Sequence, residues 1–455
     1  MMNPTTHSPW NAFRRKYFWR VGIGLLMIGL LVSGWLWHSA CDRVQAKLNA
    51  LRAKGLPTTV QEINAFYTIP AGATDRTREW VTAIDALLLA SAQLSTASVP
   101  VVGLNSNPIP QPGTPWAEFE VSRQVIRDLD AELQLIRAAA SVPGQVRFPI
   151  DCSLGPVALL THIQRVRHVA RIMVLDAYVS AHEGQHSRIL QNIRTISALS
   201  EATRAEPFLI PYYVGTAINS VALGEIEKWI SYCGWSDAEL VSLQMLILSP
   251  RFEEEIVRSL AGDQAFGLTE LDKMVLGPFR QSVQLEYLRL IDDGMNSFSY
   301  PWPEPLIRQA AITARLNALK SEPLSLLKYS QVPSYGPAVE QAGRTVARSV
   351  AKQRCCVLLI AAQRYRLQTG QLPVSLKEIE NSKLWPSTVP QDLFVDPFDG
   401  QPLRFKADAT GMVIYSVSQN RADDGGEIPS TSSQVRDNGF KLLRNKMVHD
   451  LEVKE

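Results

Sequence analysis

An uncharged apolar stretch near the start constrains this chain more than any other feature. Residues Val21–Trp37, VGIGLLMIGLLVSGWLW, contain no Asp, Glu, Lys or Arg. As a helix they would be about 25 Å long, close to the roughly 30 Å apolar core of a bilayer. Aromatic residues stand at both ends, as they do at the headgroup depth of membrane spans; these are Tyr17, Phe18, Trp19, Trp35 and Trp37. We therefore predict one transmembrane helix at residues 21–37.

The charges around this stretch predict its orientation. Four basic residues precede it with no acid in the first twenty positions, namely Arg14, Arg15, Lys16 and Arg20. Basic residues collect on the cytoplasmic side of membrane spans, so residues 1–20 are predicted to be a cytoplasmic tail. The chain would then be a single-pass protein of the bacterial inner membrane, with its bulk in the periplasm. A cleaved signal peptide or a lipoprotein site at Cys41 is the alternative, which His38 disfavours by replacing the small or aliphatic residue expected there.

Composition limits the kinds of protein that this chain can be. The chain has 455 residues, of which 46% are hydrophobic, so it can bury a sizeable core in two or three domains. A net charge of +2 provides no general attraction for nucleic acid, and no nucleic-acid partner is predicted. The five cysteines include no C-x-x-C pair. They indicate buried small side chains rather than a disulfide framework or a zinc ribbon.

Helical periodicity dominates the next three hundred residues. Apolar residues recur every three to four positions, and the apolar phase shifts by about 100° at Gly184, which predicts a helical hairpin turning there. The texture resembles tetratricopeptide arrays, but no 34-residue period emerges. The fold class predicted is mainly α, with an N-terminal transmembrane helix and an irregular, TPR-like body of helical hairpins. A helical pattern covers 157–231 with the break at Gly184. Further helices are expected at 42–55, 58–67, 80–93, 117–140, 210–232, 237–248, 252–259, 282–293 and 337–368.

The pattern changes near the C-terminus. Two short β-prone runs, Pro402–Lys406 and Met412–Val417, flank the five residues Ala-Asp-Ala-Thr-Gly, which predicts a β-hairpin. The domains predicted are therefore a tail at 1–20, a membrane span at 21–37, an extracytoplasmic helical domain at 38–336, and a long helix with a small α+β segment at 337–455.

This last segment resembles the major pseudopilin of bacterial type II secretion. The resemblance rests on four motifs in the same order, YRLQTGQLPVSLKEI, DPFDGQPLRF, MVIYSVSQN and ADDGGE. It implies a long helix, a short helix, a hairpin and a calcium-binding loop rich in glycine and acidic residues. Two features of pilins are missing, because the apolar stretch lacks their glutamate and lies about 300 residues before the pilin-like helix. The resemblance therefore implies a borrowed C-terminal module and not assembly into a pilus.

The whole chain also resembles a group of uncharacterised, membrane-anchored helical proteins of bacteria. Segments like LRAKGLPTTVQEINAFY, RFPIDCSLG, GDQAFG and YPWPEPL precede the same ending in that group. The resemblance implies no activity. Local packing is the simpler interpretation of GDQAFG and YPWPEPL, although Trp302 between two prolines is an alternative exposed docking point.

The loop after the second strand is the candidate metal site. By the resemblance, Asp423, Asp424 and Asp437 are the predicted Ca²⁺ ligands, with Asn420 and Glu427 nearby. Calcium takes six to eight oxygen ligands, and Gly425–Gly426 would let the loop fold around an ion. A solvated acidic turn without metal is the alternative.

The segment HEGQH, residues 182 to 186, matches the zinc-protease pattern H-E-x-x-H. On one continuous helix His182 and His186 would share a face and bind zinc, while Glu183 would act as general base. Glu201 or Glu206 would supply the third ligand. Glycine inside the motif and the phase break at Gly184 argue against one continuous helix.

The sequence thus leaves two hypotheses. The first is a membrane-anchored, extracytoplasmic scaffold or interaction protein of the cell envelope, bound to the membrane through residues 21–37 and to an unknown envelope protein, with no catalytic residues identified. The second is a membrane-anchored zinc metallopeptidase that uses His182, Glu183 and His186.

Overall fold

The structure is a computed structural model that describes residues 9–94, 99–103, 108–151, 156–274, 279–321, 332, 336–428 and 436–444. It is mainly helical, as predicted, with one small sheet. The helices are α1 (Pro9–Ala53), α2 (Val60–Phe66), α3 (Thr77–Ala90), α4 (Phe119–Asp128), α5 (Asp130–Ser141), α6 (Pro156–His182), α7 (His186–Arg204), α8 (Leu209–Ile230), α9 (Asp237–Leu248), α10 (Phe252–Lys273), α11 (Arg280–Ser297), α12 (Glu304–Ser321), α14 (Gly336–Thr369) and α15 (Leu376–Ser382). The strands are β1 (Arg404–Ala407), β2 (Gly411–Ser416) and β3 (Asn438–Leu443).

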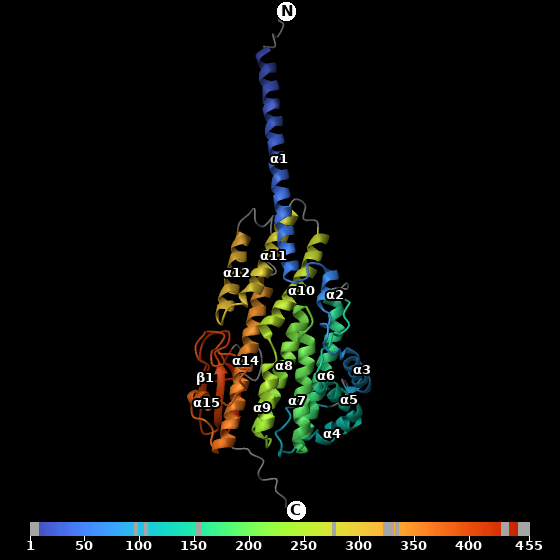
Figure 1. Ribbon diagram of the computed structural model, residues 1–455, viewed down its shortest axis with the longest axis vertical. Helices are drawn as coiled ribbons and strands as arrows, with labels where there is room; N and C mark the ends of the chain where they lie inside the picture. Colours follow the sequence, from blue (N-terminus) through green and yellow to red (C-terminus); the bar gives the residue numbers. More distant parts are fainter. Residues whose placement is uncertain are drawn as a thin grey trace, which may run out of the picture.

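The body is elongated, and its longest helices run along the long axis (Figure 1). Helices α6, α7, α8 and α14 lie along its centre. Helices α3, α4 and α5 cover one flank, and the sheet and α15 cover the other. Helix α1 projects from one end of the body.

Helix α1 joins the apolar stretch to the body without interruption. Its N-terminal part exposes large apolar side chains, among them Leu25, Ile28 and Leu31 at 59–69% exposure. Its C-terminal part packs on α11, where Val44 and Leu51 are buried. Among the described residues no helix is both long enough and apolar enough to cross a membrane. The side chains at positions 22, 30, 32, 33 and 36 of the predicted span lie outside the described residues.

Helix α14 is the central element of the body. The run Cys355–Ala362 is completely buried on every face, because its sequence CCVLLIAA has no polar side. The helix packs against α8, α9 and α12 and also against β2 and β3. Two apolar cores therefore continue across residue 337, the domain boundary that the sequence predicts.

The predicted hairpin is confirmed, and a third strand joins it. Strands β1 and β2 pair antiparallel, with Arg404 opposite Tyr415. Strand β3 pairs antiparallel along the other edge of β2, which the sequence analysis missed. Gly411 allows this pairing, since a Cβ there would lie 2.1 Å from the carbonyl oxygen of Leu442.

The structure corrects two predicted helices and adds one that was not predicted. The helix expected at 117–140 is two helices, because the backbone departs from helical geometry at Leu129. The helix expected at 252–259 continues to Lys273, through both glycines of GDQAFG. Those glycines serve close packing: a Cβ on Gly262 would lie 1.8 Å from the carbonyl oxygen of Pro207, and one on Gly267 would lie 2.1 Å from the Tyr287 hydroxyl. Helix α12 was not predicted at all.

Residues expected to be structural are mostly buried. Cys233, Cys355 and Cys356 lie in the core, whereas Cys152 lies outside the described residues. Trp302 is 8% exposed and donates its indole N–H to Glu253 Oε1 at 3.0 Å. The alternative of an exposed docking point at Trp302 is therefore wrong.

Candidate functional site

The HEGQH segment forms a turn between two helices, as the phase shift predicts. Helix α6 ends at His182 and α7 begins at His186, while Gly184 has φ +71°, a conformation that glycine adopts without strain. The two histidines therefore do not occupy consecutive turns of one helix. The structure lacks the geometry that the zinc-protease pattern requires.

The side chains of this turn have other partners. The His182 ring lies 5.1 Å from the Trp116 ring and 5.6 Å from the Phe119 ring, and its Nε2 is 3.2 Å from the Pro110 carbonyl oxygen. Burial lowers the pKa of His182. Glu183 accepts a hydrogen bond from Arg123 Nε at 2.8 Å. These contacts attach the turn to the segment 110–123 and explain the motif without a metal.

The acidic loop brings its three predicted residues together. Asp423 Oδ1 accepts hydrogen bonds from the Tyr415 hydroxyl and the Gly425 amide, each at 2.9 Å. Asp424 Oδ2 accepts one from Asn420 at 2.9 Å. The negative charges of Asp423 and Asp424 lie close enough to Asp437 to raise its pKa, in addition to the larger effect of its burial.

Asp437 is the buried member of this loop, at 1% exposure. Its Oδ2 accepts the Gly426 amide at 2.8 Å. Its Oδ1 is buried and has no hydrogen-bond partner within the described part of the chain. An unsatisfied carboxylate oxygen beside two further carboxylates is chemistry that suits a calcium ion. Among the described residues, however, no three His, Cys, Asp or Glu side chains are placed to hold a metal ion together.

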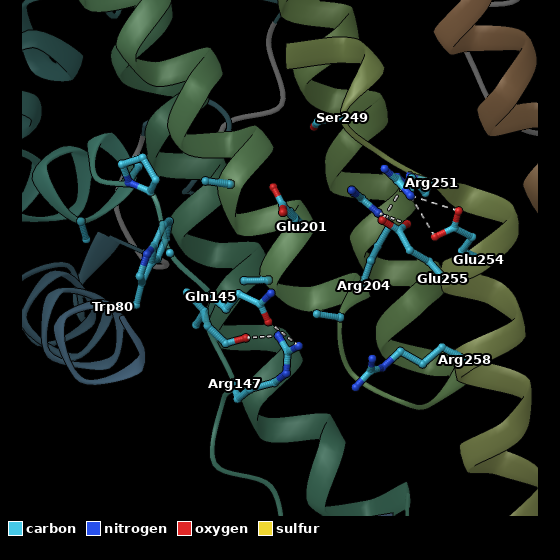
Figure 2. A pocket seen from close by; sticks show the side chains of 18 of the residues that line it. Trp80, Gln145, Arg147, Glu201, Arg204, Ser249, Arg251, Glu254, Glu255 and Arg258 are labelled. Atoms are coloured by element: carbon cyan, nitrogen blue, oxygen red, sulfur yellow. Dashed lines mark hydrogen bonds and ion pairs between the residues drawn. The ribbon is translucent and has the colours of Figure 1, made fainter. Parts of the chain in front are cut away.

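A polar cavity in the described part of the chain was not predicted from the sequence. It has a volume of about 670 Å³ and lies between the segment 139–147, the C-terminal part of α7, and the N-terminal half of α10. Figure 2 shows the charged side chains that these elements contribute to its lining. The charged residues that line it are Arg147, Glu201, Arg204, Arg251, Glu254, Glu255 and Arg258.

Two of its arginines are paired with carboxylates. Arg204 is buried and donates from Nε to Glu255 Oε2 at 2.7 Å. Arg251, an exposed residue at the rim, lies 3.3 Å from Glu254. Together these pairs use two of the three glutamates, which leaves Glu201. Burial raises the pKa of Glu201, while Arg204 lowers it.

Arg147 is held by neutral groups. Its backbone amide donates to Thr77 Oγ1 at 3.0 Å, and its guanidinium donates to the Val146 carbonyl oxygen at 2.9 Å and to Gln145 Oε1 at 2.8 Å. The guanidinium also lies over the Tyr67 ring, 5.5 Å from its centroid.

Arg258 is held in the same way from the other wall. It donates from Nη2 to the Phe66 carbonyl oxygen at 2.7 Å and lies 4.6 Å from the centroid of the Phe66 ring. Neither Arg147 nor Arg258 forms an ion pair with a carboxylate among the described residues. The Nε atoms of both are buried without a hydrogen-bond partner.

The sequence carried little signal for this cavity. Its two unpaired arginines are 111 positions apart by their numbers, and both depend on the end of α2 for their orientation. The chain matches no family model, no curated protein and no solved structure.

Proposed function

We propose that this protein is a single-pass, membrane-anchored interaction protein of the bacterial envelope, whose helical body lies outside the cytoplasm. The observation that carries the proposal is the projecting half of α1. Ten large apolar side chains between Trp19 and Trp37 are 45–69% exposed there, far more apolar surface than a soluble body leaves in contact with water. The basic residues before it favour a cytoplasmic N-terminus.

The attachment of α1 supports the same proposal. Lys47 forms an ion pair with Asp292 of α11, and Lys54 Nζ lies 3.8 Å from the same carboxylate. With Val44 and Leu51 in the core, the helix is fixed to the body just beyond its exposed half. An apolar rod fixed to a folded body is suited to anchoring.

The acidic loop would stabilise the C-terminal sheet in this proposal. Calcium bound by Asp423, Asp424 and Asp437 would compensate the buried Asp437 carboxylate and connect the β2–β3 loop to both strands. The pseudopilin-like ending would then serve as a rigid part of the interaction surface.

Membrane fractionation tests the anchoring. The double variant Leu25→Arg/Ile28→Arg places two charges in the apolar stretch, each unfavourable by about 3 kcal/mol in a membrane helix. We expect the wild-type chain to stay in the membrane pellet after alkaline carbonate extraction and the variant to be released. The control variant Leu89→Arg/Val121→Arg changes two equally exposed residues of the body and should stay in the pellet. Release of the wild type would contradict the proposal.

A C-terminal reporter tests the topology. Alkaline phosphatase fused after residue 455 is active only in the periplasm, so we expect high activity in intact cells. An inactive phosphatase fusion together with a fluorescent cytoplasmic fusion would place the body inside the cell and overturn the proposal.

A further inference from the structure

The cavity between α7 and α10 contains two arginines, Arg147 and Arg258, that form no ion pair with a carboxylate among the described residues. Four arginines and three glutamates line it, and two arginines pair with two of the glutamates. The remaining groups are Arg147, Arg258 and Glu201. Burial raises the pKa of Glu201, which makes its charged form less favourable than in water.

The two unpaired guanidiniums face each other. Figure 2 shows Arg147 and Arg258 extending toward one another from opposite walls, with Glu201 on the wall above them. They are close enough for the charge of Arg147 to lower the pKa of Arg258, beyond the larger effect of burial. Glu201 and Asp75 act on Arg147 only through longer-range attraction. Two like charges brought together and partly dehydrated are unfavourable unless an anion joins them.

The arginines are also fixed in place before any ligand arrives. Each is in contact with an aromatic ring, Tyr67 or Phe66, and each donates to a backbone carbonyl oxygen. The segment that carries Arg147 is held by a bridge between Asp75 and Gln145 and by the Thr77 contact. A rigid pair of guanidinium forks matches the geometry of carboxylate and phosphate oxygens, and preorganisation reduces the entropy lost on binding.

From this geometry we infer that the cavity binds a small molecule bearing an oxyanion, a phosphate or a carboxylate, between Arg147 and Arg258. The volume of about 670 Å³ is within the range of ligand pockets and exceeds a single phosphate. Part of the wall is apolar, with Phe66, Trp80 and Val146 among its residues. The rest of the ligand would lie against these side chains. The inference goes beyond the proposed anchoring and does not depend on it.

Titration calorimetry on the full chain in detergent micelles tests this inference, with inorganic phosphate and benzoate as separate probes at constant ionic strength. Phosphate tests the oxyanion alone, and benzoate adds an apolar ring for the Phe66 and Trp80 wall. We expect at least one probe to bind with a Kd in the millimolar range or below. Tighter binding of benzoate would assign a carboxylate ligand, and tighter binding of phosphate a phosphorylated one. No heat of binding from either probe at tens of millimolar would overturn the inference.

Variants locate the binding. Arg147→Gln and Arg258→Gln should each weaken binding about tenfold, since each removes a charge-assisted hydrogen bond. Arg194→Gln removes an exposed arginine of α7 outside the cavity and should leave Kd unchanged. Glu201→Gln should tighten binding about threefold, a change of sign that a merely damaged fold would not produce. Unchanged affinity in both Arg147→Gln and Arg258→Gln would show that the probe binds elsewhere.

A second variant tests the inference if Arg147→Gln does not fold. If Arg147→Gln fails to melt cooperatively, Arg147→Lys retains the charge but lacks the fork. It should bind more weakly than wild type and more tightly than Arg258→Gln. Wild-type affinity in Arg147→Lys together with unchanged affinity in Arg258→Gln would again overturn the inference.

Discussion

The HEGQH turn and the arginine cavity differ in two ways. A sequence motif marks the turn but not the cavity, and two polar side chains of the turn have partners, whereas two arginines of the cavity lack an ion-pair partner among the described residues. The turn has the spelling of a catalytic site, yet His182 and Glu183 are already engaged by Pro110 and Arg123. The cavity has no recognisable motif, yet in the described part of the chain neither Arg147 nor Arg258 forms an ion pair. Binding capacity depends on which polar groups the fold leaves unsatisfied, and a local motif does not reveal this.

The largest expected effect is on the free energy of unfolding, and it distinguishes the ion-paired Arg204 from the unpaired Arg258. Arg204→Ala leaves Glu255 without its partner and removes the contacts of a fully buried side chain. It should lower the free energy of unfolding by about 3 kcal/mol. Arg258→Gln, which breaks no ion pair, should cost less than about 1 kcal/mol. Urea unfolding followed by circular dichroism measures both free energies. Equal losses would show that the ion pair does not make Arg204 more important for stability than Arg258.

The next effect concerns the two histidines of the turn. His182→Ala removes a ring packed between Trp116 and Phe119 and should cost about 1–2 kcal/mol. His186→Ala, at the start of α7, should cost less than about 0.5 kcal/mol. Elemental analysis should find the same zinc content in both variants and the wild type. Stoichiometric zinc that disappears in both variants would restore the metallopeptidase hypothesis.

A pH titration tests Asp263, a half-buried acid on the helix that carries Arg258. Burial raises the pKa of Asp263 to about 7, while the Leu209 amide, 3.1 Å from Oδ2, opposes the shift. The native state therefore keeps a proton that the unfolded chain releases above its ordinary pKa. This stabilising contribution is present at low pH and is lost as pH rises through 7. Stability should fall by about 1 kcal/mol between pH 6 and pH 8 from this group.

The Asp263→Asn variant is the matched control for that titration. The amide cannot ionise, so the stability of the variant relative to the wild type should rise by about 1 kcal/mol between pH 6 and pH 8. A difference independent of pH would show that Asp263 does not titrate in this range.

The smallest expected effect comes from calcium at the acidic loop. At a concentration about three times its Kd, Ca²⁺ should stabilise the native chain by a little under 1 kcal/mol, seen as a small rise in Tm. Asp437→Asn should abolish the rise, whereas Asp408→Asn in the β1–β2 turn should retain it. A Tm unaffected by calcium in the wild type would favour a solvated acidic turn.

Much of the fold was accessible from local sequence because local patterns determine it. The phase shift placed the turn at Gly184, and the uninterrupted apolar run of α14 predicted the buried helix within one residue at each end. Long-range contacts produced the errors. The helix expected at 252–259 continues through GDQAFG, where Gly262 packs against Pro207, about fifty residues away. Strand β3 forms only because β2 offers it an edge.

The candidate sites also differ in whether local sequence or long-range contacts determine them. The acidic loop is nearly contiguous in sequence, and the motif brought its residues to attention. Arg147 and Arg258 come from different parts of the chain and meet through Phe66 and Tyr67. Nothing within ten residues of either arginine indicates that it would lack a carboxylate.

Helix α1 continues as one helix from Pro9 to Ala53, and its last turns are fixed to α11. Such a rod is about 68 Å long and has no hinge at which the body can swing. With the anchor in a bilayer, the tilt of the buried half would determine both the height of the body above the lipid and the side it presents to neighbours. Inserting a flexible glycine linker after His38 would allow the body to move independently of the tilt of the membrane-embedded half of α1.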